Sequence, residues 1–389
     1  MQRSTERILV THTGSLPRSP ELTAALAQRD RGEQVNGDLP AMIREGVRDI
    51  VARQVEAGIT VVNDGEASKI RYATYVKERL DGFGGQSESH EPDPYAEEFP
   101  DFAKSRSGSP GEARPACIGP IAYRDMDAVH ADIANLRAAV RNVEVDDVFM
   151  TAASPGIIAG SLENRYYPSD EAYLYALADV MKTEYDEIHR AGFVLQLDCP
   201  DLTSRRHLHG ESLEEYRRRV QVHIDALNHA TRDIPGEAMR LHVCWGNEEA
   251  PHVHDVALGD IIDLLFEARP SALSFEAANP RHAHEWVLFE EIALPDNKVL
   301  IPGVVDSTTN YVEHPELVAQ RIVRYAQLVG RENVIAGSDC GFATLATAPT
   351  VYPTVTWAKL RALADGARRA SEQLWPIGDR HNSVSTPVT

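Results

Sequence analysis

The sequence predicts an α/β chain folded as a (β/α)8 TIM barrel, and three patterns indicate this class. Eight short apolar runs alternate with longer segments whose apolar residues recur at helical spacing. Such alternation produces parallel strands joined by right-handed crossovers. Chemically reactive side chains gather where the runs end, as they do at the C-terminal ends of barrel strands. An open sheet of eight parallel strands is the alternative, but no Gly-x-Gly-x-x-Gly motif follows the first run.

Each expected strand is a short apolar run between two longer polar or amphipathic segments. In chain order these runs are Ile8–Thr13, Thr60–Asn63, Val148–Ala152, Val194–Asp198, Met239–Cys244, Leu273–Glu276, Val299–Pro302 and Val334–Gly337. The residues that end them are Thr13-Gly14-Ser15, Asp64-Gly65-Glu66, Ala153-Ser154-Pro155-Gly156, Asp198-Cys199-Pro200-Asp201, His242-Val243-Cys244, Glu276, Asp306 and Asp339-Cys340. Random placement would scatter such residues over both ends of the strands, so this clustering indicates an enzyme.

The segments between the strands are predicted to be amphipathic helices. The clearest examples are Ala41–Ala57, Tyr173–Arg190, Pro315–Leu328 and Pro353–Ala364. In the first of them Ile43, Val47 and Ile50 fall on one helical face.

One stretch interrupts this alternation. Residues 82–115 are rich in Gly, Ser, Pro, Glu and Asp and show no helical period. We expect 82–145 to form an excursion between strands two and three over one mouth of the barrel, with a strand or hairpin at Cys117–Tyr123 and a helix near Ala128–Val140. The prediction is a single domain over 1–389, with a frayed tail after residue 375.

Composition limits the possible functions. The chain has 389 residues with 59 acidic and 39 basic side chains, a formal charge of −20, which disfavours nucleic acid and anionic membranes as partners. No apolar run reaches about 18 residues, and the N-terminus lacks a signal-peptide pattern, so we expect a cytoplasmic protein. A homo-oligomer is compatible with these observations. The four cysteines make no disulfide framework, and Cys117 and Cys199 are expected to be ordinary buried thiols.

Four residues at strand ends are predicted to form a metal site. His242 and Cys244 are two positions apart on a strand, so their side chains point to the same face. Glu276 and Cys340 end two further strands near that face. An imidazole, two thiolates and a carboxylate can hold Zn²⁺ tetrahedrally, and sulfur ligands favour zinc over an oxygen-rich site. The alternative is a core histidine beside inert buried cysteines.

The charge of this ligand set indicates its chemistry. Two thiolates, a carboxylate and a neutral imidazole carry −3 against the +2 of zinc, which makes the centre a poor electrophile. It suits an incoming thiol, which loses its proton near neutral pH on zinc and stays nucleophilic. Glu276 is the hard oxygen ligand that we expect to give way to the softer sulfur. The prediction is a zinc-bound thiolate that attacks an alkyl carbon.

Two further strand-end residues are candidate catalytic groups. His12, just before the Thr-Gly-Ser turn, is interpreted as a proton shuttle or, alternatively, as a hydrogen-bonded core histidine. Asp306, at the end of strand seven, is interpreted as a residue that orients a ligand histidine or contacts substrate. Three His-x-His pairs are expected in solvated polar loops: His207 with His209, His252 with His254, and His282 with His284.

Together the strand ends resemble the cobalamin-independent methionine synthase family, in particular its catalytic C-terminal barrel. The matching segments are Thr13-Gly14-Ser15-Leu16-Pro17, Gly65-Glu66, Gln196-Leu197-Asp198, His242-Val243-Cys244, Glu276 and Ser338-Asp339-Cys340-Gly341. The resemblance spans nearly the whole chain. It implies a (β/α)8 barrel with one zinc ion, held by His242, Cys244, Glu276 and Cys340, that activates homocysteine for methylation.

The resemblance also assigns roles around the substrate. It implies that Gly14 and Ser15 hold the carboxylate of homocysteine and that Glu66 and Asp198 hold its ammonium group. Backbone N–H groups and a hydroxyl suit a carboxylate, and acidic side chains suit an amine. Structural alternatives are a turn or helix cap for Ser15 and an ion pair or cap for the two acids. The methyl donor implied is a methyl-folate or a methylated corrinoid protein.

The sequence departs from the family pattern at several positions. Cys199-Pro200 stands where Glu-Pro is expected. Cys244-Trp245-Gly246-Asn247 and Asn279-Pro280-Arg281-His282 are similar to the short, single-barrel branch, which includes epoxyalkane:coenzyme M transferases. A sulfonate-bearing thiol of that kind would call for an anion clamp from Arg18, Arg205, Arg206 or Arg281. A more distant alternative is a metal-free barrel of the uroporphyrinogen decarboxylase type, which needs clustered arginines that these acidic strand ends lack.

Overall fold

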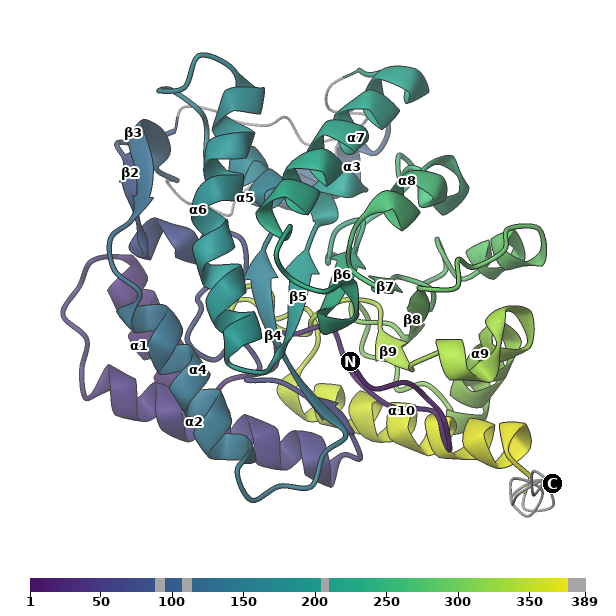
Figure 1. Ribbon diagram of the computed structural model, residues 1–389. Helices are drawn as coiled ribbons and strands as arrows, with labels where there is room; N and C mark the ends of the chain where they lie inside the picture. The colour runs from purple at the N-terminus through teal and green to yellow at the C-terminus, as the bar shows by residue number, and fades with distance from the viewer. Residues whose placement is uncertain (88–94, 107–113, 204–209, 377–389) are drawn as a thin grey trace, which may run out of the picture.

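The computed structural model describes residues 1–87, 95–106, 114–203 and 210–376 (Figure 1). The α-helices are α1 (Pro20–Asp30), α2 (Leu39–Glu56), α3 (Pro100–Arg106), α4 (Asp127–Val140), α5 (Pro155–Ser161), α6 (Asp170–Arg190), α7 (Leu213–Ala230), α8 (Ile262–Glu267), α9 (Pro315–Val329) and α10 (Pro353–Leu374). The strands are β1 (Val61–Val62), β2 (Leu80–Gly84), β3 (Ala116–Tyr123), β4 (Asp147–Ala153), β5 (Val194–Asp198), β6 (Met239–Val243), β7 (Ala272–Phe275), β8 (Val299–Val305) and β9 (Gly337–Ser338).

A curled parallel sheet lies at the centre of the molecule, with helices on its outside (Figure 1). In the described residues it has seven strands in the order β1-β4-β5-β6-β7-β8-β9, and every neighbouring pair is parallel. Because parallel neighbours share a direction, the C-terminal ends of these strands lie on one edge. Seven of the eight expected strands are found here, with shifted ends, and the mixed α/β class is confirmed.

The expected first strand, Ile8–Thr13, is the exception. It contributes only a parallel bridge between Val10 and Ala336, just before β9. The N–H groups of Thr60 and Val61 donate to the Val10 carbonyl at 3.0 and 2.9 Å, so this segment joins the two edges of the sheet. The Thr11 N–H still donates to the Ala336 carbonyl at 2.8 Å, but the Thr13 N–H donates to a side chain, Ser338 Oγ, at 3.1 Å, so the backbone ladder does not continue.

The helices follow their sequence signals. The expected helices at 41–57, 173–190 and 315–328 correspond to α2, α6 and α9, and the pattern at 353–364 begins the longer α10. Ser212 and Glu215 form a capping box at the start of α7, which satisfies two backbone donors that a helix leaves free. Helix α1 was not anticipated from periodicity, although Ser19 caps it and Pro20 occupies its first turn.

Between β1 and β4 the chain forms a separate antiparallel pair, β2 with β3, followed by α4. Arg79 anchors this region to the outer helices, donating to Asp132 of α4 at 2.5 Å and to Glu184 of α6 at 3.3 Å. Tyr75 donates to the other Glu184 oxygen at 2.6 Å. Parts of the expected excursion, and the tail after 376, lie outside the described residues. No described helix is long and apolar enough to cross a membrane.

A candidate metal centre beside a buried carboxylate pair

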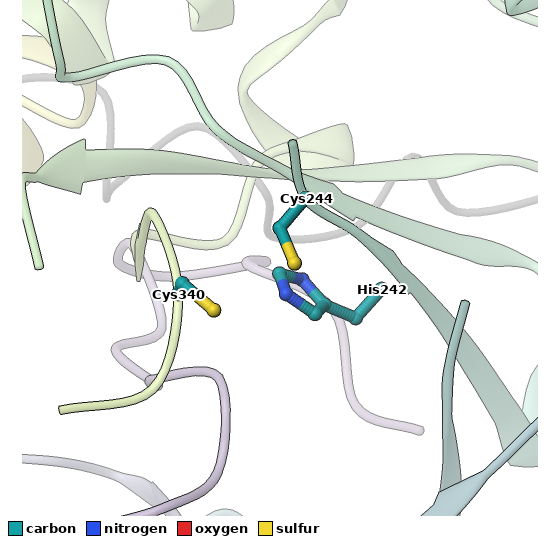
Figure 2. Close-up of side chains that lie close together, drawn as sticks. All are labelled: His242, Cys244 and Cys340. Carbon is teal, nitrogen blue, oxygen red and sulfur yellow. The ribbon is translucent and has the colours of Figure 1, made fainter. Parts of the chain in front are cut away.

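Three predicted metal ligands lie together at the strand ends. His242 is on β6, Cys244 follows that strand, and Cys340 follows β9. One ligand atom of each lies within 4.8 Å of the others, and all three residues are buried. The two sulfur atoms approach the His242 ring from different elements (Figure 2). His242 and Cys244 therefore lie on one face of the β6 end, and the curl of the sheet places Cys340, which follows β9, beside them.

The His242 ring is held in an orientation that suits a metal ligand. Its Nδ1 lies 3.3 Å from Ser274 Oγ on the neighbouring strand β7. Its Nε2 is buried and has no hydrogen-bond partner among the described residues. With Nδ1–H donating to the serine, Nε2 keeps a lone pair directed away from that strand, which is how outer partners fix the tautomer of ligand histidines. A buried, orphaned imidazole nitrogen beside two sulfurs fits a zinc ion.

The pKa values of the two thiols are shifted in opposite directions. A hydrogen bond from Cys340 lowers the pKa of Cys244 well below its ordinary value, against the opposing effect of burial, and His242 and the Gly246 N–H act in the same direction. The same hydrogen bond, followed by burial, raises the pKa of Cys340. Of the two thiols, Cys244 is therefore the one that loses its proton more readily.

Glu276 adjoins this group but lies outside the 4.8 Å set. It follows β7, and its Oε1 accepts the Trp245 N–H at 3.0 Å. Its Oε2 accepts from Asn279 Nδ2 at 2.7 Å. Burial, then the charges of Cys244 and Asp339, raise the pKa of Glu276 well above its usual range. The carboxylate is therefore fixed by two donors in a negative environment that a cation would relieve.

Asp339 is a supporting residue to which sequence reasoning gave no role. Its Oδ1 accepts the N–H groups of Ala277 and Ala278, both at 2.8 Å. Its Oδ2 accepts from the backbone N–H and side chain of Asn279, at 2.8 and 3.1 Å. Because Asp339 precedes Cys340, it ties the turn that carries one ligand to the turn that carries Glu276. Its position directly before Cys340 is the one sequence signal for a role at the site. Its partners lie about 60 residues away, so a local pattern does not reveal them.

A second group, next to the first, contains Glu66 and Asp198, and Asp198 on β5 is the register partner of His242 on β6. Both are buried, and Glu66 Oε1 accepts from Thr151 at 3.0 Å, whereas its Oε2 has no partner among the described residues. Asp198 Oδ1 accepts from Gln196 at 2.7 Å. Burial, and then the charge of Glu66, raise the pKa of Asp198 to about 7. Two neighbouring acids with an unused oxygen form an environment suited to a cationic ligand group.

Backbone strain directs Glu66 into this position. Gly65 and Glu66 have φ angles of 63° and 57°, and only glycine adopts that region without cost. A Cβ at Gly14 would lie 2.6 Å from Glu66 Oε1, so glycine is required there for the carboxylate to approach the first turn. The structure therefore brings Gly14, Glu66 and Thr151 into contact.

Ser15 links the two groups. Its Oγ accepts the Ala343 N–H at 3.2 Å, and its carbonyl accepts the Phe342 N–H at 2.9 Å, so it is packed against the turn that follows Cys340. Arg18 ties the same turns together rather than presenting a free cation. Its guanidinium donates to the carbonyl oxygens of Leu16, Ala343, Glu66 and Lys69 at 2.5–3.5 Å.

His12 and Asp306 have structural partners. The His12 Nε2 bonds to Gln54 of α2 at 2.8 Å, and burial lowers its pKa to about 4. Both oxygens of Asp306 accept from the N–H and hydroxyl groups of Thr308 and Thr309, at 2.5–2.9 Å. Burial raises the pKa of Asp306, but these hydrogen bonds outweigh it and lower the value overall. Among the described residues, neither side chain hydrogen-bonds to the three-residue metal group.

The prediction that the loop histidines are solvated is wrong for His282 and for His252. His282 is 3% exposed and pairs with two carboxylates, and His252 pairs with Asp255 at 3.0 Å. Packing between two loops buries His282 and half-buries His252, which a local polar pattern does not reveal. His284 is exposed as expected. Cys117 and Cys199 are buried thiols as expected. His207, His209, Arg205 and Arg206 lie outside the described residues.

Comparisons with known proteins are consistent with this geometry. Residues 120–364 match a family model described as the catalytic domain of cobalamin-independent synthase. The chain is 23% identical over 334 residues to a methionine synthase from Thermococcus kodakarensis, covering 85% of this chain and 86% of that one. It is 24% identical over 335 residues to a methionine synthase from Pyrococcus furiosus, covering 85% of each.

A solved structure has the same fold. It is a B12-independent methionine synthase from Shewanella sp. W3-18-1 in complex with selenomethionine, and it superposes with a TM-score of 0.72 at 20% identity. The match covers 95% of this chain and 99% of the other.

Proposed function

The chain belongs to the cobalamin-independent synthase catalytic-domain family, and on this premise we propose that it is a zinc-dependent methyltransferase that methylates homocysteine. The observation that carries the proposal is the juxtaposition of a buried His–Cys–Cys group with a buried pair of acids on one edge of the sheet. One group suits a thiol-activating metal and the other suits an amine, and homocysteine has both functional groups.

The residues proposed to hold zinc are His242, Cys244 and Cys340, with Glu276 as the fourth ligand. When bound, zinc supplies the positive charge that keeps a coordinated thiol deprotonated at neutral pH. The protein's own part is positional. Ser274 fixes the His242 tautomer, and Trp245 and Asn279 hold the two Glu276 oxygens. Trp245 and Asn279 would keep both Glu276 oxygens hydrogen-bonded whether or not the carboxylate held the metal, so this buried group would not lack partners in either case.

The proposed amine site is the Glu66 and Asp198 pair. An ammonium group can donate to the partnerless Glu66 Oε2 and neutralise the repulsion between the two acids. Lys69 is nearby, but its Nζ donates to the carbonyl and hydroxyl oxygens of Thr151, at 2.6 and 3.3 Å. Gly14 and Ser15 are proposed to receive the substrate carboxylate through their backbone N–H groups.

Glu66 and Asp198 also argue against the alternative function, in which a sulfonate-bearing thiol like coenzyme M adds to an epoxide. A sulfonate placed beside two carboxylates would be repelled. Two of the candidate anion clamps are engaged elsewhere, since Arg18 bonds to backbone carbonyls and Arg281 donates to the Val253 carbonyl at 3.2 Å. A decarboxylase of the uroporphyrinogen type gains no support from an acidic strand-end edge.

Several coarser features are part of the same proposal. We propose that the curled sheet and the segment 8–13 together make a (β/α)8 barrel, with 1–389 as a single domain and 82–145 as an insertion. The methyl donor is proposed to be a methyl-folate or a methylated corrinoid protein, and the location cytoplasmic. His12 and Asp306, first expected to be catalytic, are proposed to act only through packing and turn geometry.

Elemental analysis and ligand-protection measurements test the proposal directly. The purified protein should contain zinc near one per chain, and homocysteine should raise its thermal unfolding temperature more than coenzyme M does. Methyl transfer to homocysteine should require the metal. A metal-free preparation with full activity, or stronger protection by the sulfonate, would overturn the proposal.

A further inference from the structure

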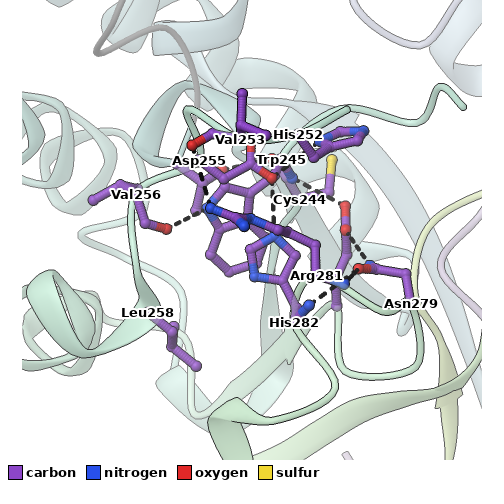
Figure 3. Close-up of polar contacts among 12 residues, drawn as sticks. Cys244, Trp245, His252, Val253, Asp255, Val256, Leu258, Asn279, Arg281 and His282 are labelled. Carbon is purple, nitrogen blue, oxygen red and sulfur yellow. Dashed lines mark hydrogen bonds and ion pairs between the residues drawn. The ribbon is translucent and has the colours of Figure 1, made fainter. Parts of the chain in front are cut away.

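A buried ring stack lies directly behind the candidate metal centre. The Trp245 indole and the His282 imidazole have ring centroids 3.9 Å apart and an interplanar angle of 24°. Figure 3 shows the two rings lying face to face, with Cys244 beside Trp245 in the chain. His282 belongs to the turn after β7, whereas Trp245 belongs to the loop after β6. The stack therefore joins the two loops that carry Cys244 and Glu276.

The hydrogen bonds of His282 require a charged ring. Its Nδ1 lies 2.9 Å from Glu285 Oε2, and its Nε2 lies 3.0 Å from Asp255 Oδ2. A neutral imidazole has only one N–H, so one of these contacts would set a lone pair against a carboxylate. With both nitrogens protonated, the ring donates to both acids and lies as a cation on the indole face.

The tryptophan under this cation has both of its N–H groups engaged. Its indole Nε1 donates to the Val256 carbonyl at 2.7 Å, and its backbone N–H donates to Glu276 Oε1 at 3.0 Å. The same two loops meet again where Glu285 Oε1 accepts the Leu258 N–H at 2.7 Å. A change in the His282 ring would thus move Trp245, the residue that follows Cys244 and holds one Glu276 oxygen.

We infer that His282 is a positioning residue for the metal centre: its imidazolium, held between Asp255 and Glu285, fixes Trp245 and thereby orients the Glu276 carboxylate and the Cys244 backbone. This inference rests on the proposed function, because it concerns the same metal ligands. Among the described residues, the hydrogen bonds of His282 go to Asn279, Glu285 and Asp255 rather than to a proposed metal ligand. The charge on the ring is the essential property, since a neutral ring of the same shape cannot satisfy both carboxylates.

The test compares metal binding among matched variants. His282→Gln removes the cation, His282→Arg keeps a flat cation with several donors, and His284→Gln changes an exposed histidine two residues away. Zinc affinity is measured by competition with a chromogenic chelator. Cobalt(II) substitution, read by visible absorption, reports the ligand geometry. We expect His282→Gln to weaken zinc binding roughly 10- to 100-fold, the usual cost of losing an outer-shell partner, and to alter the cobalt spectrum.

The controls separate charge from shape and the inference from the proposed function. His282→Arg should recover a large part of the affinity, and His284→Gln should behave as wild type. If His282→Gln fails to fold, Asp255→Asn combined with Glu285→Gln removes the charge pairing while keeping the ring, and should weaken binding in the same direction. Wild-type affinity and spectrum in a folded His282→Gln variant, or equal impairment by His282→Arg, would overturn the inference. A wild-type protein that binds no zinc would overturn the proposed function first.

Discussion

The two halves of the strand-end surface are built differently. The metal half, made of His242, Cys244, Glu276 and Cys340, is supported by donors that are already in place. The carboxylate half, made of Gly14, Ser15, Glu66 and Asp198, keeps a partnerless carboxylate oxygen, a strained backbone and two adjacent acids. Both halves hold buried negative charge that a cation would relieve. They differ in their backbone, because Glu66 in the carboxylate half has a positive φ angle.

This difference teaches where selectivity resides. A pre-organised metal half discriminates through ligand type, because its nitrogen and sulfur donors are fixed in place. A strained acidic half discriminates through charge, because only a cation gains from entering it. The following predictions test whether the division is real, beginning with the largest expected effect.

Replacing a sulfur ligand should abolish the metal half while leaving the fold intact. Cys340→Ser should reduce zinc affinity by at least about 100-fold, since even an outer-shell partner is worth roughly 10- to 100-fold. Methyl transfer should fall with it. Cys117→Ser is the matched control, because that thiol lies outside the metal group and donates to the Gly119 carbonyl at 3.4 Å, which a hydroxyl can also do. Full zinc content in Cys340→Ser would contradict the assignment of this ligand.

Neutralising one acid of the carboxylate half should weaken homocysteine binding and raise the stability of the ligand-free protein. Glu66→Gln removes a charged hydrogen bond to the ammonium group, so KM for homocysteine should rise about 10- to 100-fold. The ligand-free variant should be more thermally stable than wild type by about 1 kcal/mol, because one of two repelling buried charges is gone. Steady-state kinetics and calorimetry of the same preparation check both effects. Loss of stability without a change in KM would show that Glu66 is only structural.

The Glu66→Gln variant should also change the pH dependence of homocysteine binding. Asp198 has its pKa raised to about 7, so its carboxylate is ionised and able to hold an amine only as pH rises through that value. Homocysteine binding by wild type should therefore weaken as pH falls below about 7. In Glu66→Gln this weakening should move to lower pH, because the charge that raises the pKa of Asp198 is absent. Isothermal titration between pH 5.5 and 8.5, a range of roughly one to two units around that pKa, reads the shift.

His282 should make the metal half sensitive to alkali. Burial lowers its pKa, but Asp255 and Glu285 outweigh this and raise the value from 6.5 to about 9. Its contribution to stability is thus complete below about pH 6.5 and is lost as pH rises through 9. The full contribution is of the order of 3 kcal/mol. The free energy of unfolding of the metal-free wild type, measured with denaturant, should fall over this pH window relative to that of His282→Gln. Parallel profiles for the two proteins would contradict a charged ring.

The smallest effect is expected at Asp306. Its two oxygens are used by Thr308 and Thr309, so Asp306→Asn should cost about 1–2 kcal/mol of stability through the lost turn contacts. kcat should change by less than about 3-fold, because interactions absent from the transition state do not alter it. A loss of kcat beyond 100-fold with an intact fold would restore the catalytic role that its strand-end position suggested.

Regular structure explains what the sequence could predict. The spacing of His242 and Cys244 fixes a shared strand face, and Cys340 ends another strand at the same edge of the sheet, so these two regularities predict the three-residue group. The Trp245–His282 stack and the Asp339 clamp join irregular loops that are distant in the chain. No local pattern encodes such contacts. The first expected strand is shorter than predicted for a related reason, because beyond Thr11 the Thr13 N–H bonds to the distant Ser338 side chain instead of a neighbouring backbone.

The bridge between Val10 and Ala336 has a consequence for how the protein is made. Its partners are 326 positions apart (336 − 10), so the sheet edges can join only after Ala336 has been synthesised. Contacts between residues so far apart in sequence form late, because the entropy of closing the long loop is lost before the contact energy is gained. Cys340 follows the same late segment. We therefore expect competence to bind metal to arise at the final folding step, so that nascent or truncated chains cannot capture zinc in this site.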